Sequence, residues 1–160
     1  MNINYRPVVD SDRNWIAEKA KKDWAGEFII VTGRKLFPAN LAGFFAEDKK
    51  QNKVGLISYL ISDRVCEIIT FNAFTKQNGI GSKLLQMVID LAKENQCDKI
   101  SLVTTNDNLD ALRFYQRRGF VLVEVHRNSV DKIRPLKPGI PELGYYQIPI
   151  RDEIELELKL

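Results

Sequence analysis

The stretch KQNGIGSKLL, Lys76 to Leu85, joins an apolar segment to a segment with helical spacing. The segment before it, Ile68 to Phe74, is rich in β-branched and aromatic residues, which favours a strand. The residues after it place one apolar stripe on a helix: Ile80, Leu84, Val88 and Leu91. Glycine at such a junction lets the backbone approach a ligand closely, because glycine has no Cβ. The stretch therefore predicts a strand, a tight loop and a helix.

Three phosphate-binding schemes place glycines between a strand and a helix. A Walker loop requires GxxxxGK followed by Ser or Thr, which this sequence lacks. A dinucleotide fingerprint requires a third glycine, but Leu84 occupies that position and no regular series of βαβ units follows. The third scheme needs only Gly79 and Gly81, with the amides of residues 77–82 turned inward at a helix N-terminus to hold a pyrophosphate. The alternative is a glycine turn that only starts the helix.

Length and composition are those of an ordinary soluble globular protein. A chain of 160 residues is long enough for one well-packed domain and too short for two, so we expect a single domain over residues 1–160. The chain is 44% hydrophobic and 28% charged, with a net charge of +3. This mild charge suits a phosphorylated small molecule. Because no dense Lys/Arg block interleaves with aromatic residues, nucleic acid is not an expected partner.

The cysteine and histidine content argues against a disulfide framework and against a metal site. Cys66 and Cys97 lie in apolar surroundings and are typical of small core residues in a reduced compartment. His126 is the only histidine, so we expect no zinc and no other metal. No apolar run is long enough to span a membrane, and no signal peptide is present, so the sequence predicts a cytoplasmic protein without membrane attachment.

Hydrophobic spacing predicts a mixed α+β domain around the central strand-loop-helix unit. Residues 28–33 are compatible with either a strand or a connection, and four prolines predict an irregular loop over residues 134–149. We expect strands at residues 3–8, 41–48, 53–62, 64–74, 99–105, 120–126 and 154–160, and helices at 11–24, from 80 onward and at about 109–118.

A second motif, NDNLDALRFYQRRGF, lies one strand beyond the first helix, from Asn106 to Phe120. Its pattern is Asn-x-x-Ala-x-x-Phe-Tyr followed by Gly-Phe, and the matching residues are Asn108, Ala111, Phe114, Tyr115, Gly119 and Phe120. Together the two motifs resemble those of the GNAT superfamily of acyl-CoA N-acyltransferases. The resemblance runs from about Glu67 to Phe120, and more loosely over the whole chain through the order of its elements.

The first loop of that family follows a Gln/Arg-x-x-Gly-x-Gly/Ala pattern. This sequence matches it with Lys76-Gln77-Asn78-Gly79-Ile80-Gly81, except that lysine stands at the first position. The departure affects the side-chain contact there, while the backbone does most of the binding. The loop before it is about two residues shorter than is usual in the family. This shifts the expected placement of the preceding strand residues by the same amount.

The resemblance implies a mixed, mainly antiparallel sheet of about seven strands, flanked by helices and with two splayed central strands. It implies acetyl transfer from acetyl-CoA, as cosubstrate, to a primary amine by direct attack in a ternary complex. The thiol end of the cofactor would be reached by Tyr115, and Asn108 would hydrogen-bond the pantetheine arm. The remaining expected cofactor-binding residues are Phe71, Ala73, Lys76, Gln77, Asn78, Gly79, Ile80, Gly81 and Ser82.

Two catalytic roles follow from the same resemblance. Tyr115 matches the tyrosine that gives a proton to the departing thiolate, and the alternative is that it packs on Leu112 and only bonds the cofactor. Glu67 stands where several family members carry a glutamate base, and the alternative is that it binds water or substrate. A chain of ordered water leading to solvent is a third route for the proton of the amine.

One further carboxylate stands out from the pattern of the last strand. Apolar residues fall on even positions from Ile148 to Leu158, and Asp152 lies on the same face. A charge on an inward face needs a partner or a ligand, such as a cationic substrate. The alternative is a β-bulge near Pro149 that returns Asp152 to solvent.

No motif in the sequence identifies the acceptor. The proline-rich loop, with Tyr145 and Tyr146, is expected to line the acceptor site, because the corresponding connection does so in the family. Its length favours a small-molecule amine over a protein tail. Acetylation of protein lysines or N-termini is an alternative, and a non-catalytic acyl-CoA-binding module is another. The assembly stays open, with a homodimer as one option.

Overall fold

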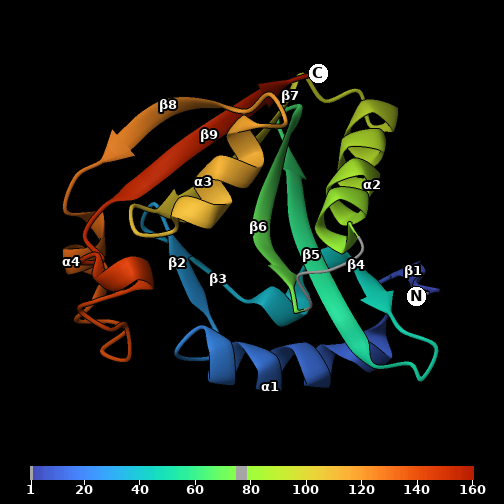
Figure 1. Ribbon diagram of the computed structural model, residues 1–160, viewed down its shortest axis with the longest axis horizontal. Helices are drawn as coiled ribbons and strands as arrows, with labels where there is room; N and C mark the ends of the chain where they lie inside the picture. The colour runs from blue at the N-terminus through green and yellow to red at the C-terminus, as the bar shows by residue number, and fades with distance from the viewer. Residues whose placement is uncertain (1, 75–78) are drawn as a thin grey trace.

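The computed structural model describes residues 2–74 and 79–160 (Figure 1). Its main sheet has seven strands in the order β1-β4-β5-β6-β7-β9-β8, and only β6 and β7 pair in parallel. This confirms the mixed, mainly antiparallel sheet that the sequence predicts. The strands are β1 (Asn4–Pro7), β4 (Ala42–Glu47), β5 (Lys53–Ser62), β6 (Val65–Ala73), β7 (Lys99–Thr105), β8 (Val121–His126) and β9 (Glu153–Lys159).

Helices cover both faces of this sheet. Residues alternate between the faces along a strand, so the paired Phe45 and Leu56 lie on one face and Ile57 lies on the other. Phe45 and Leu56 pack against Ile16 of α1, whereas Ile57 belongs to the core under α2, with Leu84. The helices are α1 (Arg13–Asp23), α2 (Ile80–Glu94), α3 (Leu109–Gln116) and α4 (Ser129–Ile133).

The two central strands separate halfway along their length. Pairing of β6 with β7 runs from Val65↔Lys99 to Ile68↔Leu102 and then ends, although β6 continues to Ala73. Just there Ile69 is an extra residue in β6, because the β5 register passes from Tyr59↔Ile68 to Ser58↔Thr70. A β-bulge of this kind bends its strand and increases the local twist. The splayed central strands expected from the resemblance are therefore present.

A small hairpin stands apart from the main sheet. Strands β2 (Ile29–Val31) and β3 (Arg34–Leu36) pair only with each other, and Thr32 and Gly33 form the turn between them. The sequence left residues 28–33 undecided between strand and connection, and it did not predict β3. It also did not predict α4, which precedes the proline-rich loop. The short helical turns are η1 (Asp10–Asp12), η2 (Pro38–Asn40) and η3 (Tyr145–Gln147).

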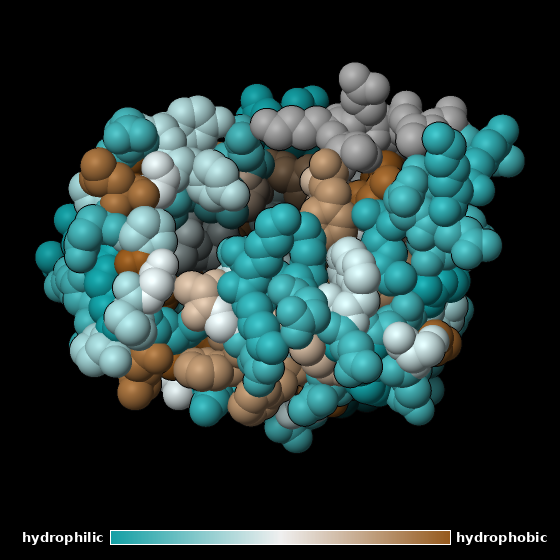
Figure 2. All heavy atoms as spheres, turned by 90° about the horizontal axis from the view of Figure 1, so that it is seen from below, coloured by the Kyte–Doolittle hydropathy of each residue, from teal (hydrophilic) through white to brown (hydrophobic). Residues whose placement is uncertain are grey.

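The other expected elements agree with the structure to within a few residues at their ends. For example, the helix expected at about 109–118 ends at Gln116, three residues before Gly119, whose φ is +91°. Over the described ranges, no helix combines the length and the apolar character needed to cross a membrane. Viewed from the side of α1, the surface is mainly hydrophilic, with apolar residues in separate patches (Figure 2).

Candidate active site

A cavity of about 640 Å³ lies where β6, the start of α2 and one face of α3 meet. Phe71, Asn72 and Ala73 line it from β6, and Gly79 to Ser82 line it from the beginning of α2. The remaining lining residues come from α3 and the loops beside it: Asn108, Asp110, Ala111, Arg113, Phe114, Tyr115, Arg117, Arg118 and Tyr145. We call this space cavity 1. It brings the two sequence motifs together.

The first turn of α2 lines this space, and the first amide groups of a helix have no partner within the helix. Gly79 is the N-cap and has a φ of +66°, a left-handed conformation that favours glycine. Phosphate groups bind well at such a terminus, because the helix dipole adds to the amide donors. The structure gives no description of Lys76, Gln77 and Asn78, so their expected contacts lie outside the described residues.

Cavity 1 carries a positive charge. Among the described residues, its charged lining residues are Arg113, Arg117 and Arg118 against the single acid Asp110. The Arg118 guanidinium lies 3.6 Å from the centre of the Phe114 ring and donates a hydrogen bond of 2.6 Å to Ser82 Oγ. Arg118 therefore connects α3 to the first turn of α2, next to the amides of that helix.

Tyr115 points from α3 into the interior at the edge of cavity 1. Its side chain is buried among Phe71, Phe114 and Phe120, with ring centroids 6.1, 5.3 and 5.3 Å away. Burial raises the pKa of the Tyr115 phenol above its ordinary value of 10.0. The phenol therefore carries its proton at neutral pH. Asn108, at the N-cap of α3, accepts a hydrogen bond from the Ala111 amide through Oδ1, and it lines cavity 1 as well.

A second cavity, of about 560 Å³, lies on the other side of the gap between β6 and β7. Four residues line both cavities, so the two spaces meet: Phe71, Asn72, Asn108 and Tyr145. The other lining residues of this space, cavity 2, come from the end of α1, from β2 and from the two splayed strands, with one from β9: Asp23, Trp24, Ile29, Ile30, Val31, Ile69, Thr70, Val103, Thr104, Thr105 and Glu153.

Tyr145 lines both cavities, and a hydrogen bond to its backbone fixes its position. The buried Asp107 carboxylate accepts a hydrogen bond of 2.9 Å from the Tyr145 amide. Gly144 makes this approach possible, since a Cβ there would lie 2.0 Å from Asp107 Oδ2. Tyr146 lines neither cavity, and its phenol hydrogen-bonds the Asp110 carboxylate, which raises the pKa of Tyr146.

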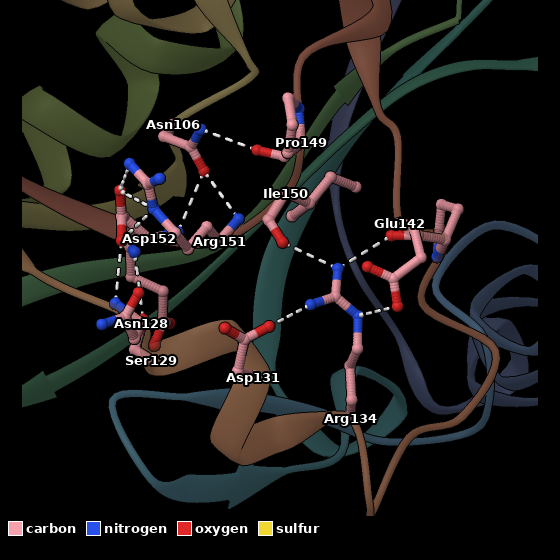
Figure 3. A network of polar contacts seen from close by, with 12 residues as sticks. Asn106, Asn128, Ser129, Asp131, Arg134, Glu142, Pro149, Ile150, Arg151 and Asp152 are labelled. Atoms are coloured by element: carbon pink, nitrogen blue, oxygen red, sulfur yellow. Dashed lines mark hydrogen bonds and ion pairs between the residues drawn. The ribbon is translucent and has the colours of Figure 1, made fainter.

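A network of polar contacts holds the loop that carries Tyr145 (Figure 3). Arg134 donates hydrogen bonds to the Ile150 and Pro141 carbonyls and pairs with Asp131. Asn106, which follows β7, holds the end of the loop just before β9, because its amide group donates to the Pro149 carbonyl and its oxygen accepts from the backbone amides of residues 151 and 152. Side-chain to backbone bonds thus replace regular secondary structure here.

Asp152 belongs to this network. Its carboxylate accepts 2.8 Å from the Asn128 amide and pairs with Arg151 at 3.0 Å, and the residue is only 6% exposed. The alternative of a bulge that returns Asp152 to solvent is therefore wrong, and the inward charge has partners within the chain. Asp152 lines neither cavity 1 nor cavity 2. Its contact with a substrate stays a prediction.

Glu67 also has a partner. Both of its carboxylate oxygens accept from the Arg34 guanidinium of β3, at 2.9 and 2.5 Å. Glu67 lines neither of the two cavities. The role of Glu67 as a base stays a prediction, and it would require this two-point ion pair to open.

Glu153, the acid that lines cavity 2 from β9, is not among the site residues predicted from the sequence. The residue is 4% exposed, and its Oε1 has no hydrogen-bond partner among the described residues. In the sequence it is one of three glutamates that alternate with apolar residues, a pattern typical of a solvent-facing strand face. In the structure, Glu153 differs from the other two glutamates because it accepts a hydrogen bond from the Thr32 amide in the turn of the β2–β3 hairpin.

The Asp152 contacts predict a pH-dependent contribution to stability. Hydrogen bonds from Arg151 and from the Asn128 amide lower the pKa of Asp152 below its ordinary value of 3.8. The carboxylate therefore stabilises the folded state above about pH 4, and this contribution is lost as the pH falls through the folded-state pKa. We expect Asp152→Asn to lower the free energy of unfolding by about 1 to 2 kcal/mol at pH 7. The difference should shrink below pH 4.

Urea denaturation across this pH range measures the effect. Asp98→Asn is the matched control, because Asp98 pairs with Arg64 at the surface, where both side chains are more than half exposed. The control should cost little at any pH. Equal stabilities of the Asp152→Asn variant and the parent at pH 7 would show that the carboxylate does not hold the loop.

Comparison with known proteins agrees with this geometry. Residues 11–120 match the family model described as the acetyltransferase (GNAT) family. The Bacillus subtilis (strain 168) sequence named "Uncharacterized protein YdhI" is 46% identical over 133 residues, which cover 83% of each chain.

Two solved structures share the fold over nearly the whole chain. An IAA acetyltransferase from Bacillus cereus ATCC 14579 superposes with a TM-score of 0.73 at 18% identity, covering 99% of this chain and 100% of the other. A GNAT family acetyltransferase from Elizabethkingia anophelis with acetyl-CoA bound gives 0.72 at 21% identity, covering 99% of both. The family match and the fold together show that the chain belongs to the acetyltransferase (GNAT) family and is an acyltransferase enzyme.

Proposed function

We propose that this enzyme transfers an acetyl group from acetyl-CoA to the primary amine of a small molecule. One observation carries the proposal: two cavities of opposite charge meet at a gap in the sheet. Among the described residues, cavity 1 is lined by three arginines and one acid, and cavity 2 is lined by Asp23 and Glu153 without a lysine, arginine or histidine. An anionic cofactor and a cationic acceptor would then meet between β6 and β7.

The chain fits the cofactor on the side of cavity 1. Beyond Ile68 the β6 backbone has no pairing with β7, so the backbone groups of Phe71 and Ala73 are open to pair with the amides of a pantetheine arm. Buried backbone polar groups require such partners. The N-terminus of α2 and the arginines of cavity 1 would hold the phosphates.

The reaction forms one bond and breaks another. The neutral amine attacks the thioester carbonyl carbon and forms the C–N bond. The tetrahedral intermediate then loses one N–H proton to solvent and breaks its C–S bond, which releases the thiolate and leaves a neutral amide. Tyr115, which is protonated at neutral pH, would donate its proton to the departing sulfur. Before the attack the amine must lose a proton, which costs about 4 kcal/mol at pH 7 for an amine of pKa near 10. Glu67 or ordered water would accept that proton.

The size of cavity 2 supports a small acceptor. About 560 Å³ lies within the range of pockets that enclose small-molecule ligands. Its walls combine aliphatic residues such as Ile29 and Ile69 with polar residues such as Thr104. A small amine that carries polar as well as apolar groups therefore fits this space.

A screen of amines for thiol release from acetyl-CoA tests the proposal. We expect release above the rate of hydrolysis with at least one small amine, and weaker or no release with peptides. The screen should include polyamines, amino acids, aminoglycosides and arylalkylamines. Release with peptides alone would assign the enzyme to protein acetylation instead.

Replacement of Gly81 tests the cofactor site. A Cβ at Gly81 would lie 3.5 Å from the Phe71 ring and 3.6 Å from the Phe114 ring, which is ordinary contact. Gly81→Ala should therefore fold and bind normally, whereas the branches of Gly81→Val would extend into cavity 1. We expect Gly81→Val to weaken CoA and acetyl-CoA alike by about tenfold, as measured by titration calorimetry. Unchanged CoA affinity in Gly81→Val would show that the start of α2 does not bind the phosphates.

Removal of the Tyr115 hydroxyl tests proton donation. Tyr115→Phe keeps the ring in its aromatic cluster but has no proton to give. We expect the turnover number to fall by about 10²-fold, with the Kd for acetyl-CoA nearly unchanged. Pre-steady-state measurement of the chemical step is the decisive readout, and Tyr5→Phe serves as a control at a tyrosine that lines neither cavity. A Tyr115→Phe enzyme as fast as the parent would rule out the acid role.

A further inference from the structure

Four glutamates share one face of the sheet beside the gap. Along β9, Glu153, Glu155 and Glu157 alternate with apolar residues and so point to the same side. Glu67 lies on that side too, because it pairs with Ser101, which pairs in turn with Glu157. These carboxylates form the acidic face of the sheet.

Three of the four have a basic partner. Glu67 pairs with Arg34, Glu157 pairs with Lys99, and Glu155 lies 3.1 Å from His126 Nε2. Glu153 is buried, with only 4% of its surface exposed, yet it forms no ion pair among the described residues. A buried carboxylate without a counter-charge is costly, so the acid with the least access to water is also the one that lacks a cation.

The β2–β3 hairpin positions the Glu153 carboxylate. Glu153 Oε2 accepts a hydrogen bond of 3.3 Å from the Thr32 amide in the hairpin turn. Thr32 has a φ of +46°, a left-handed conformation that is strained for a β-branched residue. The strained turn therefore fixes one carboxylate oxygen, while the other, Oε1, has no partner among residues 2–74 and 79–160.

The unpartnered oxygen belongs to a residue that lines cavity 2. The other acid there, Asp23, is already paired with Lys19 at 3.0 Å. Glu153 is opposite Thr105 in the pairing of β9 with β7, and Thr105 lines the same cavity at the open end of β7. The free negative charge of cavity 2 is thus concentrated at Glu153, next to the splayed strands.

We infer that Glu153 binds a positively charged amino group of the acceptor in cavity 2. This assigns the acceptor to the class of small amines that are cationic at neutral pH. The inference rests on the proposed function, since it names the substrate class of the same site. A hydrogen bond between charged groups in a buried site contributes about tenfold or more in affinity.

Matched pairs of ligands test the charge requirement without turnover. We would saturate the protein with CoA and titrate three amines, each beside its alcohol: butylamine and 1-butanol, 1,4-diaminobutane and 1,4-butanediol, and phenethylamine and 2-phenylethanol. At least one amine should bind the parent about tenfold more tightly than its alcohol. A parent protein that prefers none of the amines overturns the inference.

Substitution of the carboxylate then assigns the preference to one residue. Glu153→Gln keeps an oxygen that can accept from Thr32 but removes the charge, so the preference for the amine should fall by about tenfold, with alcohol binding unchanged. Glu157→Gln is the control on the same face, since Glu157 pairs with Lys99 and lines neither cavity. An amine preference that survives in Glu153→Gln contradicts the inference.

Two checks separate this inference from the proposed function. CoA affinity should be equal in the parent and in Glu153→Gln, because Glu153 does not line cavity 1. A second result is thiol release by the parent together with an unchanged KM for the amine in Glu153→Gln. That result would support acetyl transfer and contradict only the role of Glu153. If Glu153→Gln unfolds, Glu153→Asp is the second variant, since it retains the charge on a shorter side chain. We then expect weaker amine binding, and an amine affinity equal to that of the parent would contradict direct contact between Glu153 and the amine.

Discussion

The early end of the pairing between β6 and β7 is the constraint on which the site depends. Beyond Ile68 each strand follows its other neighbour: β6 stays with β5, and β7 stays with β9 over its whole length. The extra residue Ile69 bends β6 at this point. Two rows of backbone groups consequently face each other across a gap inside the sheet. Such groups need partners, so the gap predisposes the fold to accept an extended, amide-containing ligand.

The charge on each side of the gap comes from different parts of the chain. The arginines of cavity 1 lie in or just after α3, whereas the acids of cavity 2 come from the end of α1 and the start of β9. A net charge of +3 conceals this separation, because the opposite charges nearly cancel in the total. The two cavities therefore differ in charge although the net charge of the whole molecule is small. This difference is local, and it depends on which face of the sheet each residue occupies.

Local signals predicted that the two motifs lie close together, and residues of both line cavity 1. Gly79 and Gly81 lie at the start of α2, and Asn108 and Tyr115 line the same cavity from α3. The motifs meet because the first follows β6 and the second follows β7, which are neighbouring parallel strands. Glu153, which lines cavity 2, was not predicted. Alternation in β9 placed Glu153 on a polar face, and no feature of its neighbours in sequence shows that a hairpin more than a hundred residues earlier covers that face. Sequence spacing describes faces, but it does not describe what docks on them.

The two halves of the site are also held together in different ways. The cofactor half rests on α2, α3 and β6, whose apolar side chains share one buried core that includes Leu84 and Tyr115. The acceptor half rests on the hairpin and on the loop after α4, which are held by polar contacts such as Arg34 with Glu67 and Arg134 with the Ile150 carbonyl. Core packing tolerates few changes in volume, whereas exposed polar contacts contribute little to stability one at a time. If cavity 2 holds the acceptor, as we propose, substitutions around it can change what is bound while cavity 1 and the sheet keep their geometry. For the same reason, a shared fold identifies the acetyl donor more readily than the acceptor.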